Sequence, residues 1–205
     1  MNEYWILTAS HCLDGLVPIL FQVVAGEVNI HDVYDLTEFR HVDKFFMHPN
    51  YTYTEKEFDI GLVKLKQPLV FSDTVQPIDL NYEDIPVGTW CNVTGWGLKS
   101  EDGLFLASHL QYVEVPTEDD FECGKVYPSD MRENMICAGY EGHDSCSADS
   151  GGPMVCNGKI KTFVDVIILR TYMHYRFSRP QKTSWGYCFW NWMWKTWKAW
   201  CLHRS

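Results

Sequence analysis

The sequence has no run of 18 apolar residues, although 46% of its 205 residues are hydrophobic. This absence excludes a membrane-spanning helix and still leaves enough apolar side chains for a folded core. Positive charge is also scarce, because 17 Lys and Arg stand against 27 Asp and Glu, for a formal net charge of −10. Nucleic acid is therefore not an expected partner, since phosphate binding needs clustered positive charge.

The N-terminus lacks the basic segment and the apolar stretch of a signal peptide. Yet the chain holds eight cysteines without CxxC spacing, a pattern that favours disulfide bonds over a zinc site. Disulfide bonds persist in exported proteins, so we expect an extracellular, secreted protein. An exported protein without a signal peptide is unexpected, and this contrast predicts that the chain is incomplete at its N-terminus.

Acidic residues are absent after Asp165. Residues 166–205 contain seven basic residues, no acids and six of the nine tryptophans. This abrupt change indicates a divergent Trp-rich basic tail of non-native origin. The alternative is a membrane-active segment around residues 189–195, where aromatic and cationic side chains combine as they do at membrane interfaces.

Residues 1–165 consist mainly of short segments that are rich in β-branched and aromatic residues and bounded by turn residues, which predicts an all-β barrel or sandwich. The predicted strands include Leu16–Val24, Phe39–Met47, Ile60–Leu65, Val93–Gly97 and Leu110–Val115. A hydroxyl at Thr117 followed by a carboxylate at Asp120 predicts a helix start. The proline-containing segment Leu69–Val87 reads as a linker between two halves.

The strongest chemical signal is Ser150, which lies in the segment Asp-Ser-Gly-Gly-Pro at 149–153. A serine hydroxyl is a weak nucleophile and needs a base, usually a histidine oriented by a buried carboxylate. Candidates for both lie upstream: His11 follows Thr-Ala-Ser, and Asp59 precedes Ile-Gly-Leu-Val.

These three segments, in this order, resemble those around the catalytic residues of the chymotrypsin and trypsin family of serine proteases. Gly-Trp-Gly at 95–97 and Asn-Met-Ile-Cys-Ala-Gly at 134–139 also resemble family landmarks, and the likeness covers residues 4–163. It implies a truncated chymotrypsin-like double β-barrel with the active site between the barrels. Residues 1–68 would form a partial first barrel, 69–85 a linker and 86–165 most of the second barrel.

The resemblance also implies a secreted serine endopeptidase with His11, Asp59 and Ser150 as its catalytic triad. The backbone N–H groups of Ala148 and Ser150 would form the oxyanion hole. Asp144 would lie at the base of the specificity pocket, with Ser184 on its wall, and would direct cleavage after Arg or Lys. Expected partners are protein or peptide substrates and protease inhibitors, and the expected state is a monomer.

Three disulfide bonds are implied by the same resemblance: Cys91–Cys156, Cys123–Cys137 and Cys146–Cys188. The third would be unusual, because Ser184 lies farther from Ser150 than the family pattern has it. Cys12 normally pairs with an upstream cysteine, and this chain has none there.

Two departures from the family pattern bear on activity. Asp149 would normally pair with an ammonium group that zymogen cleavage exposes, and no activation segment precedes Trp5. Ala148 stands where the family has glycine. Both departures favour an alternative, a catalytically inactive homologue that acts as a binding module.

Two further signals concern modification and metals. The sequences Asn50-Tyr51-Thr52 and Asn92-Val93-Thr94 are glycosylation sequons, the first in a predicted turn and the second in a predicted strand. Glu27, Asp35 and Glu38 lie where some trypsins hold calcium, which favours oxygen ligands. A solvated acidic loop is the favoured interpretation, so no cofactor is expected.

Overall fold

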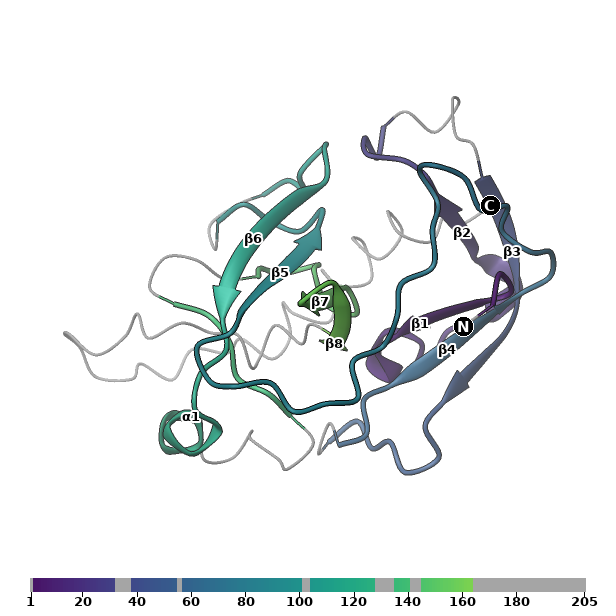
Figure 1. The fold of residues 1–205 in the computed structure, drawn as a ribbon. Coiled ribbons are helices and arrows are strands. Elements are labelled where there is room, and N and C mark those ends of the chain that lie inside the picture. The colour runs from purple at the N-terminus through teal and green to yellow at the C-terminus, as the bar shows by residue number, and fades with distance from the viewer. Residues whose placement is uncertain are drawn as a thin grey trace.

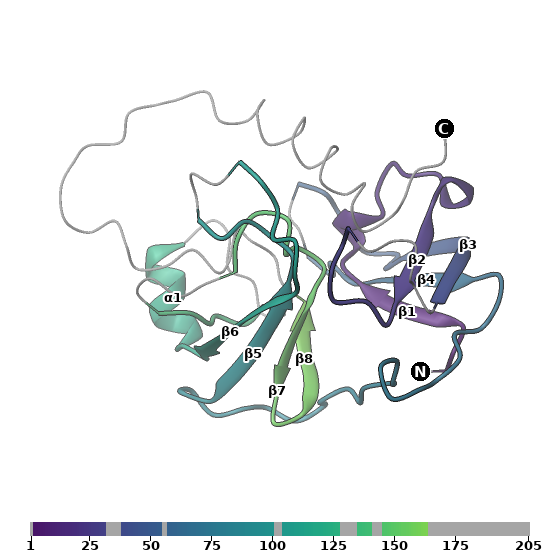
Figure 2. The same ribbon diagram turned by 90° about the horizontal axis from the view of Figure 1, so that it is seen from above.

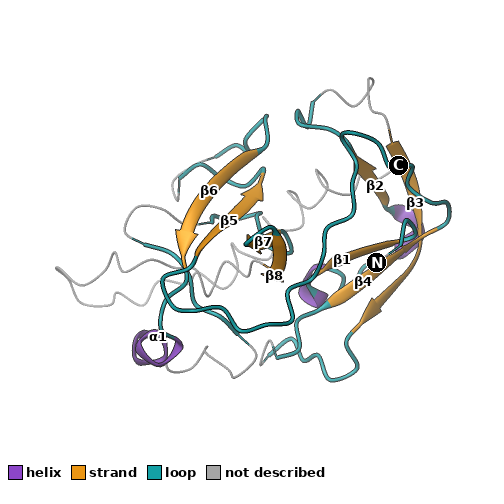
Figure 3. Ribbon diagram, viewed as in Figure 1, coloured by secondary structure: helices purple, strands orange, loops and turns teal. Residues whose placement is uncertain are grey.

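The computed structural model describes residues 2–31, 38–54, 57–100, 104–127, 135–140 and 145–163. Strands dominate these residues, and helices are few and short (Figure 3). The strands form two antiparallel sheets (Figure 1). The all-β fold class predicted from the sequence is therefore confirmed.

The first sheet contains four strands in the order β1-β4-β3-β2. Its members are β1 (Trp5–Thr8), β2 (Gln22–Ala25), β3 (Glu38–Met47) and β4 (Gly61–Leu65). One buried apolar cluster packs against this sheet and combines Val42, Val63 and Leu65 of β3 and β4 with Leu13, Phe21, Leu69 and Val75 from segments outside the strands. Burial alternates along β4, as expected for a strand with one face on a core.

The second sheet has the order β6-β5-β7-β8. It consists of β5 (Trp90–Gly95), β6 (Gln111–Pro116), β7 (Pro153–Cys156) and β8 (Lys159–Phe163). Asn157 and Gly158 join the last two strands with φ values of 53° and 75°. Positive φ at both central residues matches the right-handed strand twist and favours a tight hairpin.

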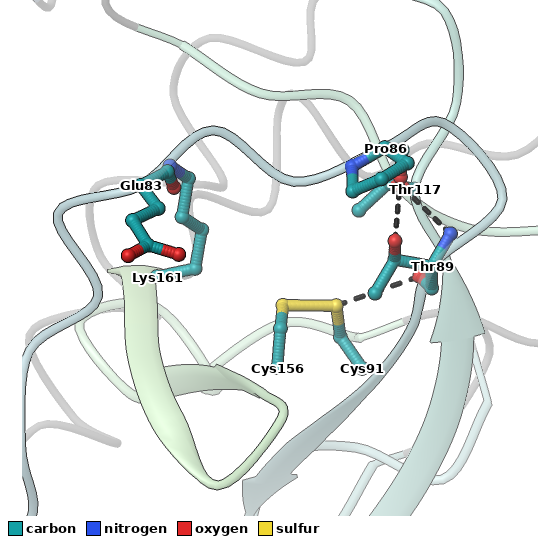
Figure 4. The surroundings of a disulfide bond; sticks show 7 residues. All are labelled: Glu83, Pro86, Thr89, Cys91, Thr117, Cys156 and Lys161. Carbon is teal, nitrogen blue, oxygen red and sulfur yellow. Dashed lines mark hydrogen bonds between the residues drawn. A yellow bond between two sulfur atoms is a disulfide. The ribbon is translucent and has the colours of Figure 1, made fainter.

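Two disulfide bonds lie in the second half. Cys91 on β5 and Cys156 on β7 are register partners and form one of them (Figure 4). Cys123 and Cys137 form the other and connect the helix α1 (Asp120–Val126) to the chain that follows it.

The predicted helix exists, but its cap differs from the prediction. Asp119, not Thr117, is the N-cap residue, because its carboxylate accepts from the Glu122 N–H at 2.9 Å. Thr117 is buried instead, and its hydroxyl donates to the Pro86 carbonyl at 2.9 Å (Figure 4). The Thr117 hydroxyl therefore takes part in a tertiary contact with Pro86 and does not form the helix cap that the local sequence pattern predicts.

The first predicted strand is also partly wrong. Within Leu16–Val24 the chain first forms the 3-10 turn η2 (Pro18–Leu20) and enters β2 only at Gln22. Pro18 fixes φ and lacks an N–H donor, which suits the first turn of a helix better than a strand interior.

A strandless segment crosses from β4 to β5 and joins the two halves, as Figure 1 shows. The halves also touch directly, because Asn29 forms a β-bridge with His109 and the Trp96 indole N–H donates to the Val28 carbonyl at 2.9 Å. Figure 2 shows the two sheets side by side from above. The predicted domain boundaries remain a prediction, with the two sheets lying within residues 5–65 and 90–163.

Candidate active site

His11 and Asp59 lie at adjacent strand ends of the first sheet. His11 sits in the 3-10 turn η1 (Ser10–Cys12) that follows β1, and Asp59 lies just before β4. The antiparallel register opposes Thr8 to Gly61, so the two segments leave the sheet together. Gly61 permits this approach, because a Cβ atom there would meet Leu13 Cδ1 at 2.7 Å.

The Asp59 carboxylate binds His11 with both oxygens. Oδ1 accepts from the His11 backbone N–H at 2.7 Å, and Oδ2 lies 2.5 Å from the ring Nδ1. The two side chains are only 7% and 13% exposed, so water competes weakly for this pair. In the neutral ring a proton on Nδ1 leaves Nε2 as an acceptor, the tautomer that a general base requires.

The pKa of His11 results from opposing effects. Burial of the imidazole lowers the pKa, but the hydrogen bonds that the ring forms with Asp59 and Cys12, and the nearby negative charge, outweigh it. The pKa of His11 therefore lies well above the ordinary value of 6.5. His11 becomes a neutral base only when the pH rises past this shifted pKa.

Ser150 is carried by a compact loop that docks against η1. The loop turns through hydrogen bonds from Asp149 N–H to the Cys146 carbonyl and from Gly152 N–H to the Asp149 carbonyl, both at 3.0 Å. The Thr8 hydroxyl donates to the Gly151 carbonyl at 3.2 Å. Gly151 has φ 80°, and a Cβ atom there would meet Thr8 and Cys12 at 2.7 Å, so only glycine fits this contact.

Cys12 also belongs to this site, although the sequence identified it only as a cysteine without its expected upstream partner. Its buried sulfur lies 3.3 Å from His11 Nε2 and 3.6 Å from the Ser150 carbonyl oxygen. It forms no disulfide bond with any residue in the described ranges. The Ser150 hydroxyl makes no hydrogen bond to a described residue, so the contact to Nε2 belongs to Cys12 in this structure.

Ala148 adopts the left-handed backbone conformation, with φ 77°. A residue with a Cβ atom pays about 1–2 kcal/mol for this conformation, which glycine adopts freely. The backbone N–H groups of Ala148 and Ser150 donate to no described residue.

Asp149 is buried against the Gly-Trp-Gly segment. Its carboxylate accepts from Gly97 N–H at 2.8 Å and from Cys146 N–H at 3.0 Å. Burial raises the pKa of Asp149, and these two amides oppose the rise without cancelling it. Across the described ranges, no Lys, Arg or His lies within ion-pair distance of this carboxylate.

Two cavities adjoin the Ser150 loop. One of about 230 Å³ contains Asp149 and is lined also by Lys99, Gln111 and Tyr112. A larger one of about 340 Å³ extends from Ser150 between the two sheets and is mostly apolar. Neither His11 nor Asp59 lines the larger cavity. Its walls include Val63 of the first sheet and Ile160 and Phe163 of the second, so it lies at the junction of the two halves.

Several predicted site residues lie outside the described residues. Asp144, Ser184 and Cys188 are among them, and so is the tail at 166–205. The predicted specificity pocket and the predicted Cys146–Cys188 bond therefore remain predictions. In the part of the chain that the structure describes, no helix is long and apolar enough to cross a membrane.

The predicted calcium loop falls only partly within the structure, because Asp35 lies outside the described residues. Glu38 pairs with Arg40, and Glu27 accepts from the Val28 N–H at 3.0 Å. Both described carboxylates thus have local partners.

Comparison with known proteins places this chain in a family. The sequence profile described as Trypsin matches residues 1–173. The chain is 36% identical to Serine protease 1 of Rattus norvegicus over 166 residues, which are 80% of this chain and 66% of that protein. It is 37% identical to Trypsin II-P29 of Gallus gallus, with 80% of this chain and 65% of that protein covered. The chain thus spans just under two thirds of the length of these two relatives.

A third relative and a solved structure agree with these matches. Trypsin of Sus scrofa is 35% identical, with 80% of this chain and 70% of that protein covered. The structure of neuropsin, a serine protease expressed in the limbic system of mouse brain, superposes with a TM-score of 0.71 at 29% identity, covering 78% of this chain and 71% of that one. The chain belongs to the trypsin family of serine proteases.

Proposed function

We propose that this protein is a secreted serine endopeptidase that cleaves peptide bonds after Arg or Lys. The observation that carries the proposal is the double contact between His11 and Asp59, at 2.7 Å and 2.5 Å, with the Ser150 loop docked beside it. An oriented, buried imidazole next to a serine in a tight loop is the arrangement that nucleophilic catalysis needs.

In the proposed reaction the Ser150 oxygen attacks the carbonyl carbon of the substrate, and His11 Nε2 takes the hydroxyl proton. The C–N bond then breaks as His11 returns this proton to the departing amine, and an acyl-enzyme remains on Ser150. Water, activated by His11, hydrolyses the acyl-enzyme. The N–H groups of Ala148 and Ser150, which donate to no described residue, would stabilise the oxyanion, a contribution of several kcal/mol in such sites.

Preference for Arg or Lys rests on Asp144 and on the family, since the relatives are trypsins. A carboxylate at the base of a pocket attracts a cationic side chain and forms charge-assisted hydrogen bonds with it. Exchanging Asp144 for Ser should therefore lower kcat/KM for Arg and Lys substrates much more than for apolar ones.

Active-site titration with a fluorophosphonate, read by intact mass, tests the proposal. We expect stoichiometric labelling of the wild-type chain and none of the Ser150→Ala variant. Equal labelling of both proteins would refute the proposal. Far-UV circular dichroism on the same samples separates an inactive fold from an unfolded chain.

A second candidate, a binding module without catalysis, is favoured by two observations. Cys12 occupies His11 Nε2, and Ala148 bears a Cβ atom in the left-handed region. Saturable binding of a peptide inhibitor by a folded chain that takes no label at any pH would establish it.

A further inference from the structure

The glycosylation sequon at Asn50 lies in an exposed turn directly after β3. Asn50 and Thr52 are both exposed, and the chain between them belongs to no strand. Their side chains make no hydrogen bond with any residue in the described ranges. The carboxamide and the hydroxyl that define the sequon are therefore both accessible.

The turn itself is well defined. The Asn50 N–H donates to His48 Nδ1 at 3.2 Å, and the Tyr51 N–H donates to the His48 carbonyl at 2.9 Å. The His48 ring stacks on Phe58 with a centroid distance of 4.8 Å. These contacts use backbone groups and the His48 side chain, so they leave the Asn50 side chain directed to solvent and tolerant of a bulky substituent.

The second sequon has a different backbone environment. Asn92 lies in β5, the central strand that pairs with β6 on one side and β7 on the other. Asn92 opposes Glu114 and Val155, and its neighbour Cys91 is bonded to Cys156 (Figure 4). A segment paired on both sides cannot detach to enter the active site of a modifying enzyme without breaking ladder hydrogen bonds on both sides.

We propose that Asn50 is an N-glycan acceptor and that Asn92 is not. The donor class is a lipid-linked oligosaccharide pyrophosphate in the secretory pathway. The Asn50 side-chain nitrogen forms a bond to the anomeric carbon as the bond from that carbon to the pyrophosphate oxygen breaks. The amide gives up one proton to a base, the lipid pyrophosphate departs, and no oxidation or reduction takes place.

The turn is hydrogen-bonded to residues that flank the proposed catalytic pair in the sequence. The His48 N–H donates to the Ile60 carbonyl at 3.1 Å and lies 3.3 Å from the Ser10 hydroxyl. Ser10 precedes His11, and Ile60 follows Asp59. The first sugar would therefore be attached two residues from a hydrogen-bonded junction of the active site.

The test expresses the full chain behind a cleavable signal peptide in a cell-free system that contains endoplasmic-reticulum membranes. The variants are Asn50→Gln, Thr52→Ala, Thr52→Ser and Asn92→Gln, with a known glycoprotein as positive control. We expect one slowly migrating form that an endoglycosidase removes. It should be lost with Asn50→Gln and Thr52→Ala and retained with Thr52→Ser and Asn92→Gln, because serine also satisfies the sequon.

Thr52→Ser and Thr52→Ala alter the same exposed residue, so a folding defect does not explain a difference between them. A wild-type chain without glycan beside a modified control protein overturns the proposal. So does a glycan that is lost with Asn92→Gln, or a wild-type chain that carries two glycans.

Discussion

The sulfur of Cys12 lies 3.3 Å from His11 Nε2, the atom that must accept the proton of Ser150 in the proposed reaction. This contact competes with the catalytic hydrogen bond, and it also raises the pKa of His11. We therefore expect the Cys12→Ala variant to react with a fluorophosphonate faster than the wild type near neutral pH.

The pH profile of the same reaction gives a sharper readout. Labelling requires neutral His11, so its rate should rise with pH through the raised pKa of His11 and then level off. Cys12→Ala removes one of the interactions that raise the pKa of His11, so the pH profile of this variant should shift to lower pH. Cys12→Ser keeps a hydrogen-bonding group, so its profile should shift less. Identical profiles for all three proteins would contradict a role for Cys12.

Asp59 should be essential for labelling. An Asp59→Asn exchange keeps the size of the side chain but presents an N–H where Oδ1 or Oδ2 now accepts from His11. In Ser-His-Asp triads this exchange stabilises the wrong tautomer and costs about 10⁴-fold in kcat. We expect a loss of that order in the labelling rate with unchanged circular dichroism; a loss below tenfold would argue against the assigned pair.

Ala148→Gly should stabilise the fold. The φ of 77° at Ala148 is strained for a residue with a Cβ atom, so glycine should raise the free energy of unfolding by about 1 kcal/mol. The matched control is Ala9→Gly, because Ala9 has an ordinary φ of −83°. This exchange should lower the free energy of unfolding by about 0.5–1 kcal/mol. Urea unfolding of both variants measures this, and destabilisation by Ala148→Gly would contradict the assigned strain.

Stability should depend on the protonation of Asp149. Its pKa is raised from 3.8 by burial, so the folded chain holds this proton to a higher pH than the unfolded chain does. The resulting stabilisation is complete below the unfolded pKa and is lost as pH rises through the folded pKa. The wild-type free energy of unfolding, minus that of Asp149→Asn, should therefore decrease above pH 3.8 and then level off. An increase of this difference with pH would show that Asp149 is stabilised as an anion.

The sequence by itself determined the family, the all-β class and the candidate residues His11, Asp59 and Ser150. It could do so because a reacting serine, its base and the tight glycine turn around them impose short local patterns. Short segments rich in β-branched and aromatic residues, bounded by turn residues, likewise located β3, β4, β5 and β6 to within a few residues.

Tertiary structure decided the contacts between residues that are distant in the chain or that compete for one partner. Thr117 has the local features of a helix cap, yet its hydroxyl binds the Pro86 carbonyl, and Asp119 caps the helix instead. The sulfur of Cys12 meets the Ser150 carbonyl oxygen, far away in the chain, only because the Ser150 loop docks against η1. No local pattern encodes such contacts, because hydrogen bonds and burial depend on which groups folding brings within about 3 Å of each other.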